Sequence, residues 1–279
     1  MSLLVIAACL AAGSLIGFMG GVLGIGGGLI AIPALVLLMG MSQQLAQGTA
    51  LIMVLPAIIM AVRKYNQQTR IDKRVAAAGA AGAVVFTWVG ARLALGIDSS
   101  VLRRSFAVFL FFIALFYVWQ TWRAGRLAAR RAAGQAPSKA QSDQKLHSNH
   151  KPQSDHKRAP VFTPRRASVL GMLCGTLGGF FGVGGAVLAV PIITTVFRLP
   201  QTVAQALALS MVIPGSTIAL ITYAWAGQAD WTVGVPLAIG SLLFVPVGVR
   251  LAYKLPERKL RVCFALMLFA TVALLAFES

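Results

Sequence analysis

Apolar runs of about 20 residues, separated by short polar segments, dominate the 279-residue sequence. A helix of about 20 apolar residues crosses the roughly 30 Å hydrocarbon layer of a bilayer. Only 11% of the residues are charged, whereas soluble domains contain about 25%. We therefore predict an all-α polytopic membrane protein with about 8 to 10 membrane crossings. The runs lie at 3–39, 45–62, 75–95, 102–119, 169–197, 203–225, 233–253 and 260–277.

The two halves of the sequence match each other at a constant offset of 158 residues. Residues 17–27 read G-x-x-G-G-x-x-G-I-G-G and align with 175–185, where all six glycines recur and valine replaces the isoleucine. Pro33 then aligns with Pro191. A match without a gap predicts two copies of one helical fold.

The first apolar run of each half is interrupted by glycines, at 24–28 and at 182–185. Glycine in a helix interior costs about 1 kcal/mol and proline about 3 kcal/mol. We therefore expect a helix, a glycine-rich break and a second, short helix in each half. Broken helices of this kind are typical of transporters, which bind substrates at the breaks. The earlier glycines Gly13, Gly17 and Gly21 have the four-residue spacing that favours close helix packing.

Half of the net charge of +18 lies in residues 123–166, which contain eleven Lys/Arg and two acidic residues. In a soluble protein such basicity would suggest nucleic-acid binding, but this charge lies between apolar runs. We therefore expect lipid rather than nucleic acid as the partner, and a basic, disordered linker in the cytoplasm beside anionic lipid. Residues 1–122 and 167–279 would form the two membrane repeats.

Basic loops occupy different places in the two halves. Residues 63–74 contain five Lys/Arg, and the aligned residues 221–232 contain none. The next loop, 254–261, contains four. This displacement by one helix indicates inverted repeats with an odd number of crossings, three or five, per half. Parallel repeats of four crossings are the alternative.

The breaks are the candidate substrate site, because a helix N-terminus carries partial positive charge and free N–H groups that favour anions. Polar side chains follow each break, and one arginine lies near the end of an equivalent helix in each half; these arginines either reach the lipid head groups or guide an anion. Ser216 and Thr217 follow Pro214. The candidate substrate-binding residues are Gly24, Gly26, Gly27, Gly28, Gln47, Thr49, Gly182, Gly184, Gly185, Gln205, Ser210, Arg92 and Arg250.

Residues for catalysis are missing from the apolar runs. All seven Asp/Glu lie in loops, at run ends or at the C-terminus, and the three His lie in the linker. We therefore expect no enzyme activity, no cofactor, no metal site and no intramembrane proton carrier. The three cysteines are expected to be buried free thiols, and Tyr65 and Tyr223 to be anchors at the membrane interface.

The doubled glycine motif, the prolines that follow it and Ala46-Gln-Gly-Thr49 resemble the TauE/SafE sulfite and sulfonate exporter family, also called the toluenesulfonate uptake permeases. The resemblance covers the chain except the linker. It implies a permease that moves sulfite, sulfonates or related small anions, often outward. Ala50 departs from the family pattern, which commonly has serine there.

These observations favour a secondary transporter in a bacterial-type inner membrane that exports small sulfur oxyanions or organosulfur anions. Export needs no proton carrier, because each negative charge that leaves a negative-inside cell gains about 2.3 kcal/mol per 100 mV. The alternatives are a channel or uniporter for another small anion and, more distantly, a membrane assembly protein. The sequence leaves the oligomeric state open.

Overall fold

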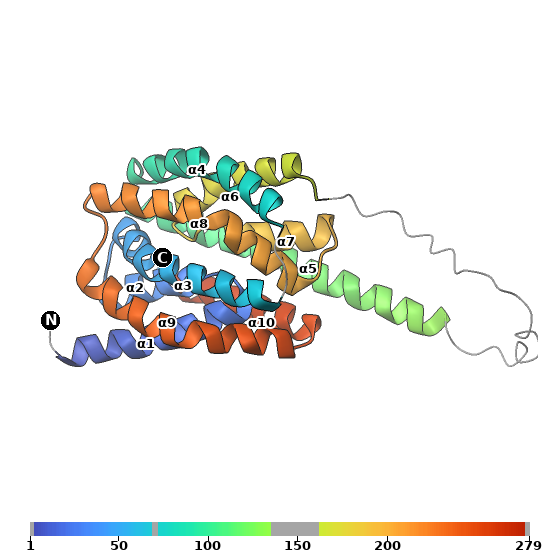
Figure 1. Ribbon diagram of the computed structural model, residues 1–279. Coiled ribbons are helices and arrows are strands. Elements are labelled where there is room, and N and C mark those ends of the chain that lie inside the picture. Colours follow the sequence, from blue (N-terminus) through green and yellow to red (C-terminus); the bar gives the residue numbers. More distant parts are fainter. Residues whose placement is uncertain (1–2, 69–71, 135–161, 277–279) are drawn as a thin grey trace, which may run out of the picture.

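The structure is a computed structural model that describes residues 3–68, 72–134 and 162–276. These residues form a bundle of α-helices (Figure 1). The helices are α1 (Leu3–Leu23), α2 (Gly28–Met39), α3 (Gln43–Gln68), α4 (Lys73–Leu95), α5 (Ser99–Gly134), α6 (Pro164–Phe181), α7 (Ala186–Val196), α8 (Gln201–Trp225), α9 (Trp231–Lys254) and α10 (Glu257–Ala276).

Within the part of the chain that the structure describes, six helices are long and apolar enough to span a membrane: α1, α3, α4, α5, α8 and α9. The short apolar helices α2 and α7 follow breaks in the chain where the glycine runs predicted them. Helices α5 and α6 reach into the predicted linker, because α5 ends at Gly134 and α6 begins at Pro164. Residues 135–161, the centre of that linker, lie outside the described residues.

Four pairs of corresponding helices begin 158 residues apart in the two halves, as in α2 at Gly28 and α7 at Ala186, whereas α1 begins at Leu3 and α6 at Pro164. The same offset relates two helix caps. The Asp72 carboxylate accepts hydrogen bonds from the first N–H groups of α4, and the Asp230 carboxylate does so for α9. Such caps satisfy N–H groups that have no partner within the helix. These four pairs of helix starts and the two caps therefore share the offset that relates the halves of the sequence.

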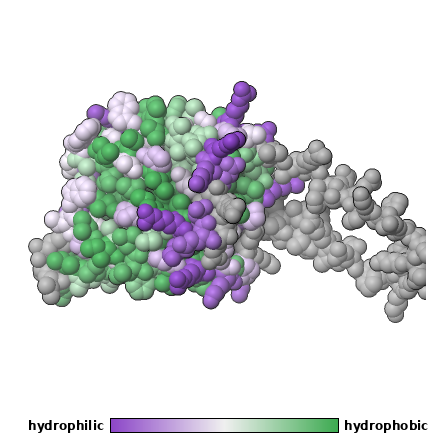
Figure 2. Space-filling view, in the orientation of Figure 1, coloured by the Kyte–Doolittle hydropathy of each residue, from purple (hydrophilic) through white to green (hydrophobic). Residues whose placement is uncertain are grey.

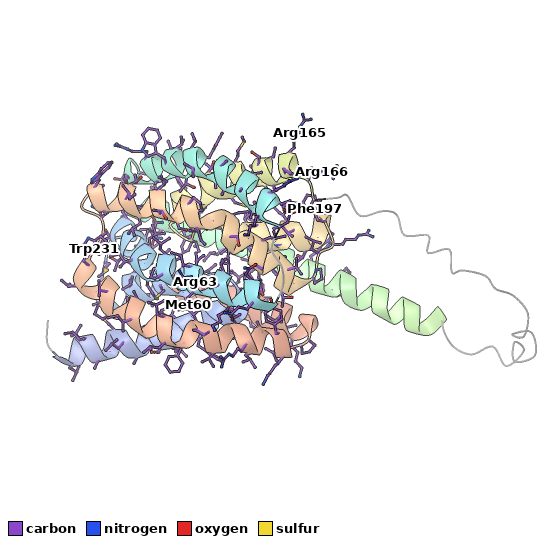
Figure 3. The ribbon with its side chains drawn as sticks, in the orientation of Figure 1. Met60, Arg63, Arg165, Arg166, Phe197 and Trp231 are labelled. Atoms are coloured by element: carbon purple, nitrogen blue, oxygen red, sulfur yellow. The ribbon has the colours of Figure 1, made fainter. Side chains whose placement is uncertain are left out.

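Each broken segment folds back as a hairpin of two helices. A groove between the arms of the second hairpin is lined by the start of α6, including Arg165, and the end of α7, including Phe197. Figure 3 shows these two residues at one end of the bundle and Trp231 at the other. The first hairpin is built the same way, since a groove there joins Leu4 of α1 to Met39 of α2. Both breaks therefore lie inside the bundle.

Each hairpin packs closely, through glycines, on a helix of the other half. Helix α1 packs along α9, and α6 packs along α4. A Cβ built on Gly17 would lie 2.5 Å from the Ser241 Cα of α9, and one on Gly175 would lie 2.6 Å from the Ala83 oxygen of α4. These positions leave no room for a side chain, which confirms the packing role predicted from the four-residue spacing.

Hydrophilic side chains gather at the end of the bundle where α6 begins, and hydrophobic residues cover most of the remaining visible surface (Figure 2). Arg165 and Arg166 mark this basic end (Figure 3). The chain starts α1 at the opposite end (Figure 1). The first helices of the two halves thus start at opposite ends of the bundle.

Candidate substrate site

Glycines in left-handed conformation form both breaks. The φ angles are 66°, 73° and 84° at Gly24, Gly26 and Gly27. The equivalent angles in the second half are 66°, 76° and 72°, at Gly182, Gly184 and Gly185. Residues with a Cβ adopt these angles only at a cost in free energy. The glycine run is therefore required by the backbone turn that starts α2 and α7.

The two breaks lie next to each other. A Cβ built on Gly28, the first residue of α2, would lie 3.8 Å from the Gly182 oxygen and 3.7 Å from the Val183 Cα. Ile58 stands between the breaks, with its Cδ1 3.0 Å from a Cβ built on Gly26 and 3.7 Å from one built on Gly184. The N-termini of two short helices thus converge on one region.

This region lies near the middle of the bundle. Helix α2 has 12 residues and α7 has 11. At about 1.5 Å per residue they extend about 18 and 16 Å from the breaks to opposite ends. These lengths are close to half of the roughly 30 Å hydrocarbon layer. The partial positive charges of the two N-termini are therefore held far from water.

Gln205 fastens the first break to the second half. Its Nε2 donates a hydrogen bond of 2.7 Å to the oxygen of Leu23, the last residue of α1. Its Oε1 accepts a hydrogen bond of 2.9 Å from the Tyr65 hydroxyl. All polar atoms of the Gln205 side chain are thus used in holding the break.

Gln47 occupies the equivalent place at the second break but is held by fewer bonds. Its Oε1 accepts a hydrogen bond of 2.8 Å from the Tyr223 hydroxyl. Its Nε2 is buried and has no hydrogen-bond partner among the described residues. A Cβ built on Gly182 would lie 2.6 Å from the Gln47 Cβ. One buried donor therefore remains available beside the second break.

The prediction that Tyr65 and Tyr223 anchor the protein at the membrane interface was wrong. Both side chains are fully buried. Each hydroxyl also lies 3.1 Å from a glycine oxygen of a hairpin, Gly21 and Gly179 respectively. Buried tyrosines need such partners for the hydroxyl, and the helices supply them here.

Two other predicted site residues bond away from the breaks. The Thr49 Oγ1 accepts a hydrogen bond of 2.9 Å from the Asp230 N–H, which ties α3 to the start of α9. The Ser210 Oγ donates to the Ala206 oxygen of its own helix at 2.7 Å. The Thr49 hydroxyl thus connects two helices, whereas the Ser210 hydroxyl is paired within its own helix.

Both predicted arginines are exposed near helix ends. The Arg92 guanidinium lies 5.7 Å from the centre of the Trp88 ring and lines a groove between α4 and α8. Arg250 occupies the equivalent place on α9. Tryptophan and arginine together are typical of the membrane interface. The structure therefore brings together the glycines and the two glutamines of the predicted site, but not these arginines.

A small cavity beside the second break is lined in part by residues that are not among the predicted site residues. Thr87 and Cys174 line it together with Ser216 and Gly184. A comparison of the two halves position by position would have indicated these residues, because the apolar Val245 and Ile16 stand at the places equivalent to Thr87 and Cys174.

Of the three cysteines, Cys9 and Cys174 are buried as predicted, whereas Cys263 is exposed, which corrects the prediction for that residue.

Comparison with known proteins shows similarity to a family of membrane proteins. The family model described as "Sulfite exporter TauE/SafE" matches residues 9–275. The chain is 22% identical over 277 residues to the "Probable membrane transporter protein YunE" of Bacillus subtilis (strain 168), and the match covers 95% of both chains. It is 24% identical over 250 residues to a "Probable membrane transporter protein" of Xylella fastidiosa (strain Temecula1 / ATCC 700964), covering 88% of this chain and 85% of the relative. No solved structure matches the chain.

The family match extends over both hairpins, both glycine breaks and the helices that surround them. Both relatives are named as probable membrane transporter proteins, and the matches cover 95% and 85% of their lengths. The chain is therefore a multi-pass membrane protein that belongs to the TauE/SafE sulfite exporter family of membrane transporters.

Proposed function

We propose that the protein is a secondary transporter that exports sulfite, sulfonates or related small sulfur oxyanions. The substrate binds between the two halves, at the glycine breaks. The observation that carries this proposal is the convergence of the N-termini of α2 and α7 on one buried region. Helix N-termini bind anions through free N–H groups and the helix dipole. The family match supports the sulfur-containing substrate class.

The chemistry around the breaks suits an anion that must be released again. The nearby polar groups are uncharged, such as the Gln47 amide and the Ser216 hydroxyl. Among the described residues, the aspartates Asp72 and Asp230 cap helices rather than face the breaks. Neutral donors stabilise an oxyanion without the strong attraction of a fixed cation. Outward movement gains about 2.3 kcal/mol per charge for each 100 mV of negative-inside potential.

The charge distribution supports an orientation with the basic end in the cytoplasm of a bacterial-type cell, because Lys and Arg near membrane spans favour the inside. The linker joins α5 to α6 and would lie on that side. The opposite starting ends of α1 and α6 support inverted repeats (Figure 1). Each half would contribute one hairpin and three crossing helices.

Proteoliposomes test the substrate and the transport mode together. Purified protein is reconstituted, and uptake of labelled sulfite, thiosulfate, taurine and sulfoacetate is measured under an imposed potential. We expect saturable uptake of at least one of these anions, accelerated when the interior is positive. Unitary currents in planar bilayers would instead identify an anion channel. Absence of flux for all four anions in vesicles that contain folded protein would refute the proposal.

A further inference from the structure

The cavity beside the second break is small and partly polar. It has a volume of about 10 Å³, which is close to the space for one water molecule. Helices α4, α6 and α8 contribute Thr87, Cys174 and Ser216 to its wall, and Gly184 contributes the break itself. The exposed fractions of the three side chains are 3%, 2% and 1% respectively. These three side chains are therefore almost inaccessible to lipid and water in this conformation.

Ser216 directs an unused hydroxyl toward the break. Its Oγ lies 3.0 Å from a Cβ built on Gly184 and has no hydrogen-bond partner among the described residues. Its neighbour Thr217 behaves differently, since the Thr217 Oγ1 donates to the Ile213 oxygen at 3.0 Å within α8. Leaving a buried hydroxyl unpaired is unfavourable. The Ser216 hydroxyl is therefore suited to a partner that arrives from outside the protein.

The first break has no such cavity wall. The positions equivalent to Thr87, Cys174 and Ser216 hold Val245, Ile16 and Ile58. All three aliphatic side chains are buried. Ile58 fills the space directly, because its Cγ1 lies 2.6 Å from a Cβ built on Gly26. The two breaks thus share a backbone but differ in the chemistry of their surroundings.

We infer that the second break alone binds the oxyanion head group, in the cavity formed by Thr87, Cys174, Ser216 and the N-terminus of α7. This inference rests on the proposed transport function and assigns its site to one of two nearly equivalent breaks. The ligand class is a compact, desolvated oxyanion such as a sulfite or sulfonate group. The two hydroxyls and the N–H groups of the first turn of α7, an 11-residue helix, donate to its oxygens. The first break serves as a structural counterpart.

The size of the cavity implies that the walls separate when the anion enters, since one water molecule is smaller than a sulfonate group. The unused Gln47 Nε2 lies beside the same break. Gln205, at the first break, already uses its Nε2 to hold Leu23. The second break is therefore both more polar and less tightly fastened than the first.

Matched variants test the inference. Ser216→Ala and Thr87→Val each remove one hydroxyl with little change in volume. Binding of sodium sulfite and of methanesulfonate to the purified full chain is measured by calorimetry, and sulfite flux is measured in proteoliposomes. We expect each variant to lose affinity about tenfold or more, because a hydrogen bond to a charged group is lost. Thr87→Ser retains the hydroxyl and should bind within a few-fold of the wild type.

Ser241→Ala is the control. The Ser241 hydroxyl is also buried and without a partner among the described residues, but it faces Gly17 in the interface between α1 and α9. We expect its affinity and flux to equal those of the wild type. A second readout uses Cys174 as the remaining thiol after Cys9→Ala and Cys263→Ala. Methanesulfonate should slow its alkylation by iodoacetamide in step with saturation of binding.

The outcomes separate the two proposals. If the wild type transports sulfite and Ser216→Ala and Thr87→Val bind it unchanged, the assignment to the second break is wrong and the transport function stands. A loss of affinity in Ser241→Ala equal to that in Ser216→Ala also overturns the assignment. If the wild type neither binds nor transports any of the sulfur oxyanions, the proposed function falls, and the assignment falls with it.

Discussion

The Tyr65 hydroxyl donates a hydrogen bond to the Gln205 Oε1 over 2.9 Å, although the two residues are 140 positions apart in the chain. The equivalent pair, Tyr223 and Gln47, forms the same bond in the opposite direction between the halves, at 2.8 Å. Each half thus supplies the tyrosine for the other half's glutamine. Both bonds lie beside the glycine breaks and hold the hairpins in place.

The two glutamines should differ in their contribution to stability. Gln205→Leu removes the bonds to Tyr65 and to the Leu23 oxygen, whereas Gln47→Leu removes only the bond from Tyr223. A side-chain hydrogen bond inside a membrane protein contributes about 0.6 to 1.7 kcal/mol. We expect Gln205→Leu to lower the free energy of unfolding by about that much more than Gln47→Leu. Denaturation in detergent micelles measures both, and equal losses would contradict the asymmetric fastening.

Steric contact at the breaks can be separated from backbone strain. A Cβ on Gly24 would lie 2.5 Å from the Gln205 Cγ, and Gly24 has a φ of 66°. Gly40 has a similar φ of 64°, but a Cβ there would meet nothing within 4 Å. Gly40→Ala should therefore cost only the strain of about 1 to 2 kcal/mol. Gly24→Ala should cost clearly more and should displace Gln205, as judged by melting temperature.

If Gly24→Ala and Gly40→Ala lower the melting temperature equally, the contact with Gln205 adds no measurable cost in stability, and the break tolerates a methyl group.

Gly184→Ala tests the second break through transport activity. Its Cβ would lie 3.0 Å from the Ser216 Oγ and would intrude on the second break. We expect it to reduce sulfite flux per folded molecule, measured after reconstitution of equal amounts of monodisperse protein.

Membrane orientation can be measured with single cysteines in a chain that lacks the three native ones. Ala226 and Gln67 are both exposed and lie at the end of α8 and the end of α3. We expect an impermeant maleimide to label Ala226→Cys in intact spheroplasts and Gln67→Cys only after lysis. Labelling of both positions from the same side would exclude inverted repeats. Labelling with the sides exchanged would reverse the orientation of the whole protein.

The linker should be dispensable for transport. Residues 135–157 are rich in polar and charged residues and have no counterpart in the repeat, so we expect them not to form a core. Replacement of this segment by a short Gly/Ser sequence should leave sulfite flux in proteoliposomes largely intact. A chain that reaches the membrane in normal amounts but has lost all flux would show that the linker takes part in transport.

Local sequence signals predicted the breaks and the helix boundaries well. Glycine and proline act on their own helix, and Asp72 caps its own helix, so neighbouring residues suffice to predict them. The prediction for Tyr65 was wrong, because a tyrosine beside basic residues near a helix end has the features of an anchor at the membrane interface. Its true partner, Gln205, lies in the other half. The polar cavity could not be predicted from local sequence either, since Thr87, Cys174 and Ser216 come from three separate helices.

The close packing of α1 on α9 and of α6 on α4 joins helices from different sequence halves, which has a consequence for how the protein would change conformation. Movement of either sequence half as a body would break these contacts, because its hairpin packs on a helix of the other half. The natural rigid units are instead α1 with α9 and α6 with α4, and they meet where α3 packs on α8. Helix α8 also packs on α4 and α6, so residues 226–230, which join α8 to α9, connect the two units. We expect this connection to act as a hinge when the site changes the side to which it opens.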